Sequence, residues 1–519
     1  MAFFHGVKGS EVPTSIVPAV ATTAGLPVVF GTAPVHLTDE PNKYVNKPVI
    51  CYDWKEAVGA LGYSGEWDKY TLSEVMFSEF QLYNVKPIIF VNVLDPKKHK
   101  AHVADTEGHA PNEDGEVIIE DSVLLPSLKI LFEETQEVID GDSPVDDDID
   151  DDLTEPATSV GGTTTVTVKT LAAPGDDYTA TYNDDGELVI AVIEGGKLDG
   201  AEKIFAEYDR VDASLVTAND IIGGVGADGS IKGMEWINQI YTLFSLVPGI
   251  IAAPGWSQNP TVAAIMKAKA LNISGLFRCI ALTDVDTEQV KQYSDVNLWK
   301  NNNNYTGNNQ VVCWPCVRNG DYIFNFSTHL LGVIGYMDAQ NDDVPYQSPS
   351  NIMLQATGLC LKDGTEINIS HDQADLLNSQ GIMTGLNFSG GWKTWGNYLA
   401  SYPSITDVKD SWICVRRMFD WRYQAFILTY WQKVDQPLMP RLIKTIVDSE
   451  QVILNGLVSR GYMLGADVKF LEDENPTTDL LAGIIRFHIY ITPPVAAQEI
   501  DAIFEYDVNN FRALFGDAA

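Results

Sequence analysis

Glycine-rich residues 224–229 (GVGADG) match the G-x-G-x-x-G fingerprint of dinucleotide-binding folds. Such a site needs a strand before the glycines and an acidic residue about 20 positions further on, which holds the ribose. Here the apolar stretch before the motif is only Ile221-Ile222, and after Glu235 the next acid is Asp284. We therefore interpret the motif as a glycine-rich turn.

Two cysteines, Cys313 and Cys316, form a C-x-x-C pair. Redox catalysis requires the first thiol at a helix N-terminus, where the dipole lowers the thiol pKa, and a zinc site requires a second ligand pair. The residues that follow, VRNGD, instead predict a strand and a turn, and no second pair has the spacing of a zinc site. We interpret the cysteines as buried thiols that flank a strand.

Histidines and one serine supply the remaining candidates. The histidines within residues 99–109 could bind a metal, but they lie in a stretch rich in lysine and glycine, which predicts a flexible segment and a coincidental cluster. Ser257 lies in GWSQN, which departs from the G-x-S-x-G nucleophile motif at its last position. His329 and His371 could act as bases, but their spacing does not place them near this serine. We expect no catalytic residue, cofactor or metal site.

Net charge narrows the possible functions. The chain holds 71 acidic and 34 basic residues, a formal charge of −37, which repels phosphate backbones and argues against nucleic-acid binding as its main task. Since no apolar run approaches the about 20 residues of a membrane span, we expect no membrane insertion. Six cysteines in 519 residues do not form a disulfide scaffold and are typical of a protein made in a reducing cytosol.

The acidic residues concentrate in one segment. Residues 98–222 hold 31 Asp and Glu against 7 Lys and Arg, a net charge of −24. Residues 137–155 contain ten acids and no base, which predicts a solvated loop. Alternating β-branched residues at 163–168 and a hairpin pattern at 178–192 predict strands. We expect 98–222 to be an acidic, mostly-β insertion domain that faces outward.

Strand and helix patterns alternate on both sides of this insertion, which is typical of an α/β domain. Apolar strands are expected at 26–33, 48–52, 87–93, 249–255 and 276–282, with helices at 71–85, 233–244 and 260–271. The continuous apolar runs predict a parallel sheet that is buried on both faces. The α/β domain is therefore expected in two parts, 23–97 and 223–364.

From residue 365 the pattern changes to α+β. Helices are expected at 418–432 and 442–458, and alternating strands at 483–492 and 500–507. We expect a C-terminal domain at 365–499. Prolines at positions 13 and 18 keep residues 5–20 extended. Both ends of the chain, 1–22 and 500–519, are therefore strand-like arms, and an unpaired strand usually joins a sheet of its own chain or of a neighbour.

The predicted fold class is thus α/β plus α+β and multidomain. It combines a split α/β core, an acidic mostly-β insertion, and an α+β C-terminal domain with strand-like terminal arms. The arm residues expected to contact another subunit are apolar: Val7, Val12, Ile16, Val20, Ile500, Ile503, Phe504, Tyr506 and Phe511.

Several short stretches, in order along the chain, resemble contractile-tail sheath proteins of bacteriophages (myovirus type) and R-type tailocins. They are HGVKGSEVP at 5–13, NKPV at 46–49, DIIGG at 220–224, IAAPGWS at 251–257, SPSN at 348–351, LNSQGI at 377–382, GGWKTWGNY at 390–398 and VRRM at 415–418. The Arg-Thr that usually follows the Trp-Gly in this family is absent here. The stretches span most of the chain except 98–222, and their order makes the resemblance specific.

The resemblance implies a structural subunit and not an enzyme. Sheath proteins form stacked six-subunit rings around a tail tube and contract on a baseplate signal, which drives the tube through a bacterial envelope. Terminal arms add strands to the C-terminal sheet of a neighbouring subunit. The implied partners are other copies of the chain, the tail tube protein, and the baseplate and tail terminator proteins. The implied location is a virion tail or tailocin particle, assembled in the host bacterial cytoplasm.

The family also suggests that the C-terminal domain faces the tube. The candidate tube contacts are the basic residues Lys433, Arg441, Lys444 and Arg460. Two other classes stay open: an α/β-domain enzyme (a hydrolase or an oxidoreductase), and another structural virion protein such as a tube or decoration protein. Hollow striated tubes in micrographs of the purified protein would indicate a sheath, whereas a stable monomer that turns over a cofactor would indicate an enzyme.

We predict that deleting residues 140–155 leaves assembly intact, because a self-repelling acidic loop stays solvated and contributes no packing. Negative-stain microscopy of the purified variant should show the same polymers as the wild type. Loss of assembly would mean that this segment holds subunits together.

Overall fold

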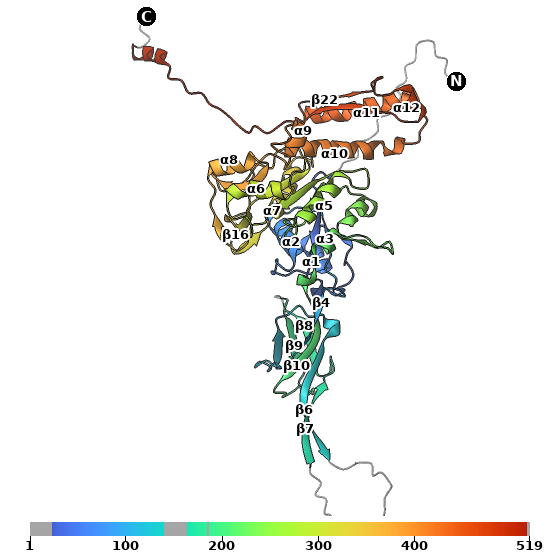
Figure 1. Cartoon of the computed structure of the whole chain (residues 1–519), viewed down its shortest axis with the longest axis vertical. Coiled ribbons are helices and arrows are strands. Elements are labelled where there is room, and N and C mark those ends of the chain that lie inside the picture. Colours follow the sequence, from blue (N-terminus) through green and yellow to red (C-terminus); the bar gives the residue numbers. More distant parts are fainter. Residues whose placement is uncertain (1–22, 140–162, 184–185, 516–519) are drawn as a thin grey trace, which may run out of the picture.

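An eight-stranded sheet lies at the centre of the molecule (Figure 1). The computed structural model describes residues 23–139, 163–183 and 186–515, and within them no helix is long and apolar enough to cross a membrane. The strands, in spatial order, are β2 (Pro48–Cys51), β3 (Ile88–Asn92), β1 (Pro27–Gly31), β13 (Ile250–Ala252), β14 (Ile280–Asp284), β15 (Gln310–Cys313), β20 (Ile382–Asn387) and β21 (Trp392–Trp395). Neighbouring strands from β3 to β20 are parallel, and β2 and β21 are antiparallel edges.

The central strands form because their sequences are mainly apolar, and each residue of β1, β3, β13, β14 and β15 is buried, including the polar Asn92, Thr283, Asp284 and Gln310. Helices that pack with this sheet are α1 (Trp54–Leu61), α2 (Thr71–Met76), a π-helical turn (Phe77–Tyr83), α3 (Ala218–Ile222), α4 (Ile240–Phe244), α5 (Pro260–Leu271), α6 (Tyr293–Asn302), α7 (Phe326–Gln340) and α8 (His371–Asn378). Asn259 begins α5 by accepting the Thr261 N–H at 2.9 Å. The mixed α/β character predicted from the sequence is confirmed.

The central sheet extends past the boundary that the sequence suggested at 364/365. β20 and β21 lie beyond that boundary, yet β20 pairs in parallel with β15. Between them the chain forms a small antiparallel sheet of β17 (Tyr322–Phe324), β16 (Cys316–Asn319), β18 (Gly358–Cys360) and β19 (Glu366–Ile367). The central sheet therefore does not end at residue 364.

The segment 98–222 contains two β-sheets at the end of the molecule opposite to the C-terminal helices (Figure 1). Its strands are β4 (Lys100–Ala104), β5 (Glu116–Ile119), β6 (Lys129–Ile139), β7 (Thr163–Leu171), β8 (Tyr178–Tyr182), β9 (Leu188–Val192) and β10 (Ile204–Val211). They form the sheets β4-β10-β6-β7 and β5-β9-β8 around a core of their own. The acidic loop at 140–155 lies outside the described residues.

Aromatic side chains join this β-module to the α/β body. The His36 ring lies 5.7 Å from the Tyr70 ring and 5.9 Å from the Tyr182 ring, measured between centroids. The Tyr70 hydroxyl also hydrogen-bonds the Ser122 hydroxyl at 2.8 Å. Because His36 is buried, the pKa of its imidazole is lowered to about 4, so the ring is neutral at pH 7. The β-module is thus connected to the α/β body by packed side chains as well as by the two segments of chain that run between them.

Two long antiparallel helices and a two-stranded sheet form the C-terminal part. The elements are α9 (Val408–Ser411), α10 (Ile413–Tyr430), α11 (Pro440–Ser459), β22 (Gly465–Lys469), α12 (Thr477–Leu481) and β23 (His488–Thr492). α10 and α11 are held together by Arg422 and Glu450, which are both buried; the guanidinium donates to the two carboxylate oxygens at 2.9 and 2.7 Å. β22 and β23 pack on α11 through Val468, Ile489 and Ile491.

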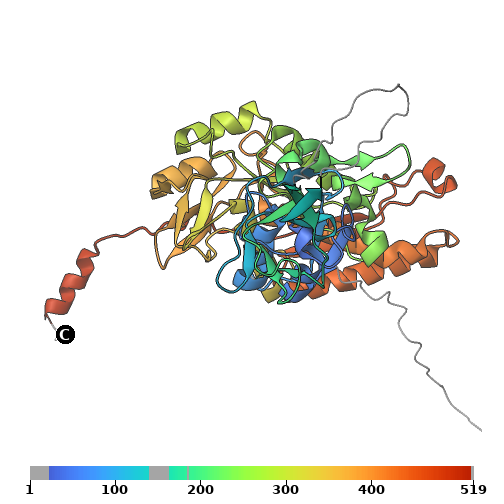
Figure 2. The same cartoon turned by 90° about the horizontal axis from the view of Figure 1, so that it is seen from below.

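Beyond β23 the chain leaves the body as an extended arm (Figures 1 and 2). The sequence predicted alternating strands at 483–492 and 500–507, but the structure contains a strand only at His488–Thr492. Residues 500–507 pair with no strand among the described residues, and a 3-10 helix follows at Val508–Phe515. A strand requires a partner ladder, and the described part of the chain forms none with these residues.

Helix α7 is fixed at its N-terminus by two buried carboxylates. Glu74 accepts hydrogen bonds from the Asn325 N–H and the Thr328 hydroxyl, both at 2.7 Å. Asp284, at the end of β14, accepts the Ser327 N–H at 2.8 Å. Burial raises the pKa of Glu74 to about 7 and that of Asp284 to about 6. The helix N-terminus that would attract an anionic ligand in such a fold is therefore filled by the chain's own side chains.

We predict that Glu74→Gln changes how stability depends on pH. The native carboxyl holds its proton up to about pH 7, whereas an unfolded glutamate loses it near pH 4.3. Between these values the native state binds more protons, so the wild-type free energy of unfolding falls as pH rises, by up to about 1.4 kcal/mol per pH unit from this group. Urea unfolding at pH 5 and pH 7 should show a smaller fall in the variant; equal falls would contradict the assignment.

We predict that Arg422→Ala destabilises the C-terminal helices by about 3–5 kcal/mol, because it leaves the Glu450 carboxylate buried without its counter-ion. The matched control is the double variant Arg422→Met/Glu450→Leu, which removes both charges and should recover most of the loss. Urea unfolding measures both. A single variant as stable as the wild type would show that water or another group solvates Glu450.

Candidate assembly surfaces

The C-terminal arm carries its apolar side chains in solvent. Ile500, Ile503 and Phe504 are 87%, 91% and 95% exposed, and Tyr506 is also exposed. Soluble chains rarely expose a contiguous run of large apolar side chains without a binding partner. Phe511, which the sequence analysis placed in the extended arm, lies instead in the 3-10 helix.

The root of this arm is attached to the body. The Cys414 thiol contacts the Pro494 carbonyl at 4.0 Å, and residues 496–499 line a cavity of about 980 Å³ beside Tyr398 and Trp412. The Tyr398 ring stacks on the Tyr402 ring with centroids 3.9 Å apart. The arm therefore has a fixed origin and a free distal part.

The sheet β22–β23 is the second candidate surface. Two-stranded sheets are marginally stable alone and leave backbone groups unpaired along both outer edges. Both views show the α10–α11 hairpin extending from the body on the side away from the C-terminal arm (Figures 1 and 2). The sheet and the arm thus lie on opposite sides of one chain.

The N-terminal arm candidates Val7, Val12, Ile16 and Val20 lie outside the described residues. The described chain begins beside a buried ion pair. Arg417 in α10 donates to both carboxylate oxygens of Asp338 in α7, one of them at 3.1 Å, and to the carbonyl of Ala24 at 3.4 Å. Arg417 and Asp338 are almost fully buried. The first described residues are thus tied to α10 and α7 of the body.

The four basic candidates for tube contact do not form one group. Lys433 precedes the α10–α11 turn, and Arg441 and Lys444 lie in the first turns of α11. Arg460 follows the last turn, about 28 Å along the helix from Arg441 at 1.5 Å per residue. Its guanidinium lies 3.9 Å from Asp342 and 5.2 Å from the ring centroid of Tyr462. Arg460 therefore has local partners at the far end of α11, and its contact with the tube stays a prediction.

Apolar residues at the same turn were missed by the sequence analysis. Trp431, Val434, Leu438 and Met439 are all exposed, and we call residues 431–439 the hairpin tip. The signal was available in the sequence, since four large apolar residues flank the helix-breaking Pro437. The tip combines an apolar centre with the basic side chains that flank it, which is the composition of many protein interfaces.

The candidate cysteines and glycines have structural surroundings. Cys313 ends β15 and Cys316 begins β16, and both are buried free thiols, as interpreted from the sequence. Burial raises the pKa of both thiols well above the usual value, which suppresses the reactive thiolate. The glycine motif forms a two-stranded hairpin, β11 (Gly224–Val225) with β12 (Ile231–Lys232), as expected of a turn.

The candidate serine and its proposed bases lie in separate networks. The Ser257 hydroxyl is buried and donates to Asp284 at 3.1 Å. His329 hydrogen-bonds the Tyr83 hydroxyl at 2.8 Å, and His371 faces Asp375 at 3.1 Å on the surface of α8. Burial lowers the pKa of His329 to about 3. These contacts hold elements together and do not align a base with the serine.

The histidines of 99–109 also have separate partners. His99 accepts the Asp95 N–H at 3.0 Å, and the His102 ring lies 3.1 Å from an oxygen of Asp209. In the part of the chain that the structure describes, no three His, Cys, Asp or Glu side chains are grouped as metal ligands are.

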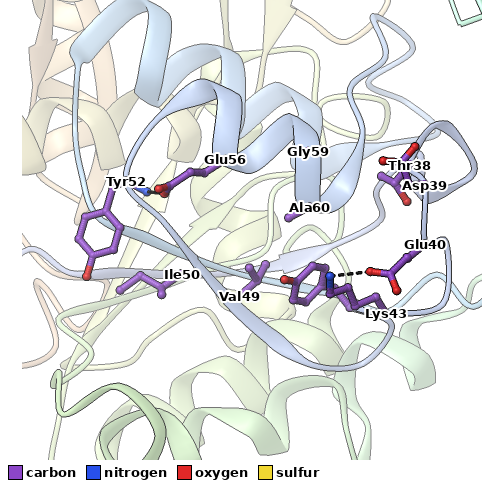
Figure 3. A pocket seen from close by; sticks show the side chains of 11 residues that line it. Thr38, Asp39, Glu40, Lys43, Val49, Ile50, Tyr52, Glu56, Gly59 and Ala60 are labelled. Atoms are coloured by element: carbon purple, nitrogen blue, oxygen red, sulfur yellow. Dashed lines mark hydrogen bonds and ion pairs between the residues drawn. The ribbon is translucent and has the colours of Figure 1, made fainter.

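Cavities on the α/β body are polar and internally paired. Figure 3 shows one of about 440 Å³ at the edge strand β2, where Lys43 bonds Glu40 at 2.6 Å and Glu56 accepts the Tyr52 N–H at 2.7 Å. A second, of about 740 Å³, lies over the ends of β13 and β14, where α/β folds usually bind ligands. There Lys291 is 3.2 Å from Asp363. The lysine named in each cavity is thus paired with a carboxylate of the same chain.

The sequence is similar to those of several known proteins. No family model matches the chain. It is 25% identical over 507 residues to the tail sheath protein of Burkholderia phage BcepMu, which covers 95% of each chain. It is 24% identical to the major tail sheath protein of Serratia phage KSP20 and 22% identical to the tail sheath protein of Escherichia phage P2, over 63% and 59% of this chain and 78% and 72% of theirs.

Solved structures share the fold at low sequence identity. A chain of the anti-feeding prophage baseplate, 6-fold symmetrised, matches with a TM-score of 0.52 and 12% identity over 98% of this chain and 100% of its own. A chain of the contracted PVC sheath complex, an extracellular contractile injection system, matches with a TM-score of 0.52 and 11% identity over 98% and 99%. Sequence and fold together confirm the resemblance, and the chain is a homologue of contractile-tail sheath proteins.

Proposed function

We propose that the chain is the structural subunit of a contractile tail sheath. Copies polymerise as stacked rings of six around a tail tube, in a virion tail or tailocin particle, and the polymer shortens to drive the tube through a bacterial envelope. The observation that carries this proposal is the exposed apolar arm on a body that also holds an incomplete two-stranded sheet. The arm is an extended segment without a partner strand among the described residues, and the sheet has an edge to which a strand can be added.

Strand exchange links the copies in this proposal. An arm from one copy adds a strand to the β22–β23 sheet of the next, so that main-chain hydrogen bonds hold the polymer together. Since the distal part of the C-terminal arm is exposed and extended, the bodies can rotate as rigid units while the links stay paired. Contraction then follows from the free-energy difference between two packings of the same subunits and requires no nucleotide.

The hairpin tip and its flanking bases are the proposed tube contact. Lys433 lies within the hairpin tip beside exposed Trp431, and Arg441 and Lys444 follow exposed Met439, in a chain of net charge −37. A basic patch on such a chain favours an acidic partner surface. Baseplate and tail terminator proteins are the proposed partners at the ends of the polymer. The β-module at 98–222, net charge −24, faces outward in this arrangement and keeps the particle soluble.

We predict that deleting residues 1–20, or separately 500–519, abolishes polymerisation and leaves the subunit folded. Each deletion removes strands given to a neighbour; residues 1–20 lie outside the described residues, and residues 500–511 are exposed. Negative-stain microscopy of the purified protein tests polymerisation, and circular dichroism melting tests folding.

The matched control replaces the acidic residues Asp501 and Asp507 by serine, which keeps the arm's apolar side chains and its backbone. This control should still polymerise. Tubes of normal length from either deletion variant would contradict strand exchange by that arm.

A further inference from the structure

The two outer edges of the β22–β23 sheet differ in how their backbone groups are satisfied. In the antiparallel register Ala466 faces Ile491 and Val468 faces Ile489. The Val468 N–H donates to Oε1 of Gln451 at 3.0 Å, and Nε2 of Gln451 donates to the Ala466 carbonyl at 3.3 Å. Because these groups bond a side chain of α11, they point away from β23.

Gln451 therefore takes the place of a peptide group of a third strand. A primary amide offers a donor and an acceptor like those of a backbone peptide, and here it bridges two residues on one side of β22. Nε2 of Gln451 also donates to Oδ1 of Asn455 at 2.9 Å, which orients the amide. The edge of β22 is closed by the chain itself, and a further strand could pair there only by displacing this side chain.

The edge of β23 is open by the same geometry. In an antiparallel pair, facing residues that do not exchange hydrogen bonds both point their backbone groups outward. Since Ala466 and Val468 point outward, their partners Ile491 and Ile489 present N–H and C=O groups along the outer edge of β23. Tyr490, between them, is 45% exposed. This edge can accept a strand without displacing Gln451.

The C-terminal arm has the pattern of a strand that covers such an edge. Ile500, Phe504 and Tyr506 fall on one face of an extended chain, and Asp501, Glu505 and Asp507 fall on the other together with Ile503. The arm is exposed over this length and pairs with no strand of its own chain. On an added strand, the apolar face would continue the layer that Ile489 and Ile491 form against α11.

We propose that the C-terminal arm of a second copy pairs with β23 along Ile489–Ile491, and that Gln451 keeps the edge of β22 closed to it. This inference rests on the proposed function, since it assumes strand exchange between copies. One acceptor edge for this arm gives every link the same register and direction. Gln451 is thus a specificity-determining residue for assembly.

Cysteine pairs distinguish the two edges. Asp467 and Tyr490 are register partners, on the sheet face away from α11. One variant series carries Tyr490→Cys and the other carries Asp467→Cys. Each is combined with a single arm cysteine, placed in turn at positions 503, 504, 505 and 506. The polymers are oxidised, and a non-reducing gel shows the cross-links between subunits. A strand added to β23 lies about 4.8 Å from position 490 and about 9.6 Å from position 467. Disulfide geometry permits only the shorter separation.

We expect cross-links with Tyr490→Cys and only wild-type background with Asp467→Cys. The background should be low, because the six native cysteines are buried. Cross-links at 467 alone would overturn the edge assignment and leave strand exchange intact. Polymers without cross-links at either position would overturn strand addition to this sheet. A wild-type protein that forms no polymer at all would instead overturn the proposed function.

Gln451→Ala tests the closed edge directly. Removal of the amide should make cross-links appear with Asp467→Cys at a level comparable to those with Tyr490→Cys. Gln451→Glu is the matched control: its carboxylate still accepts the Val468 N–H but cannot donate to the Ala466 carbonyl, so we expect a smaller increase. If Gln451→Ala leaves the pattern unchanged while melting like the wild type, Gln451 does not select the edge.

Discussion

Unpaired backbone is the constraint on which the molecule depends. The arm beyond Thr492 has no ladder partner, and the β22–β23 sheet ends after two strands. Backbone N–H and C=O groups of a strand are most stable when they are hydrogen-bonded to another strand. In a single copy, the groups of the arm and of the open sheet edge can bond only to water. In the proposed polymer each copy completes the β-structure of its neighbour, so that assembly and completion of the fold are one event.

The body that carries these edges is built to resist deformation. α7 is anchored at its N-terminus by Glu74 and Asp284 and near its C-terminus by the Asp338–Arg417 pair, which also holds Ala24. Arg422 and Glu450 lock α10 to α11 in the same way. Buried, paired charges tolerate little displacement, because separating them leaves a charge without solvent. Motion in a contracting assembly would therefore fall on the exposed distal part of the arm.

An α/β sheet of this kind usually binds ligands over the carboxyl ends of its strands, and this chain has a cavity there. The polar side chains near this cavity form hydrogen bonds and ion pairs within the protein. Ser257 bonds Asp284, which also caps α7, and the lysine and aspartate at the rim neutralise each other. The fold is that of many enzymes, but the groups that would act on a substrate are already bonded to one another, in keeping with a structural role.

Local patterns in the sequence determined much of this protein. Continuous apolar runs predicted β1, β3 and β13, Pro260 marked the start of α5, and the acidic composition of 98–222 together with its alternating residues predicted a β-rich insertion. These features depend on neighbours along the chain. Tertiary structure alone decided which distant residues meet: that β20 joins the central sheet, that Arg460 pairs with Asp342 away from the other bases, and that Gln451 closes one edge of β22. Such contacts join residues that lie far apart in sequence, and no periodicity records them.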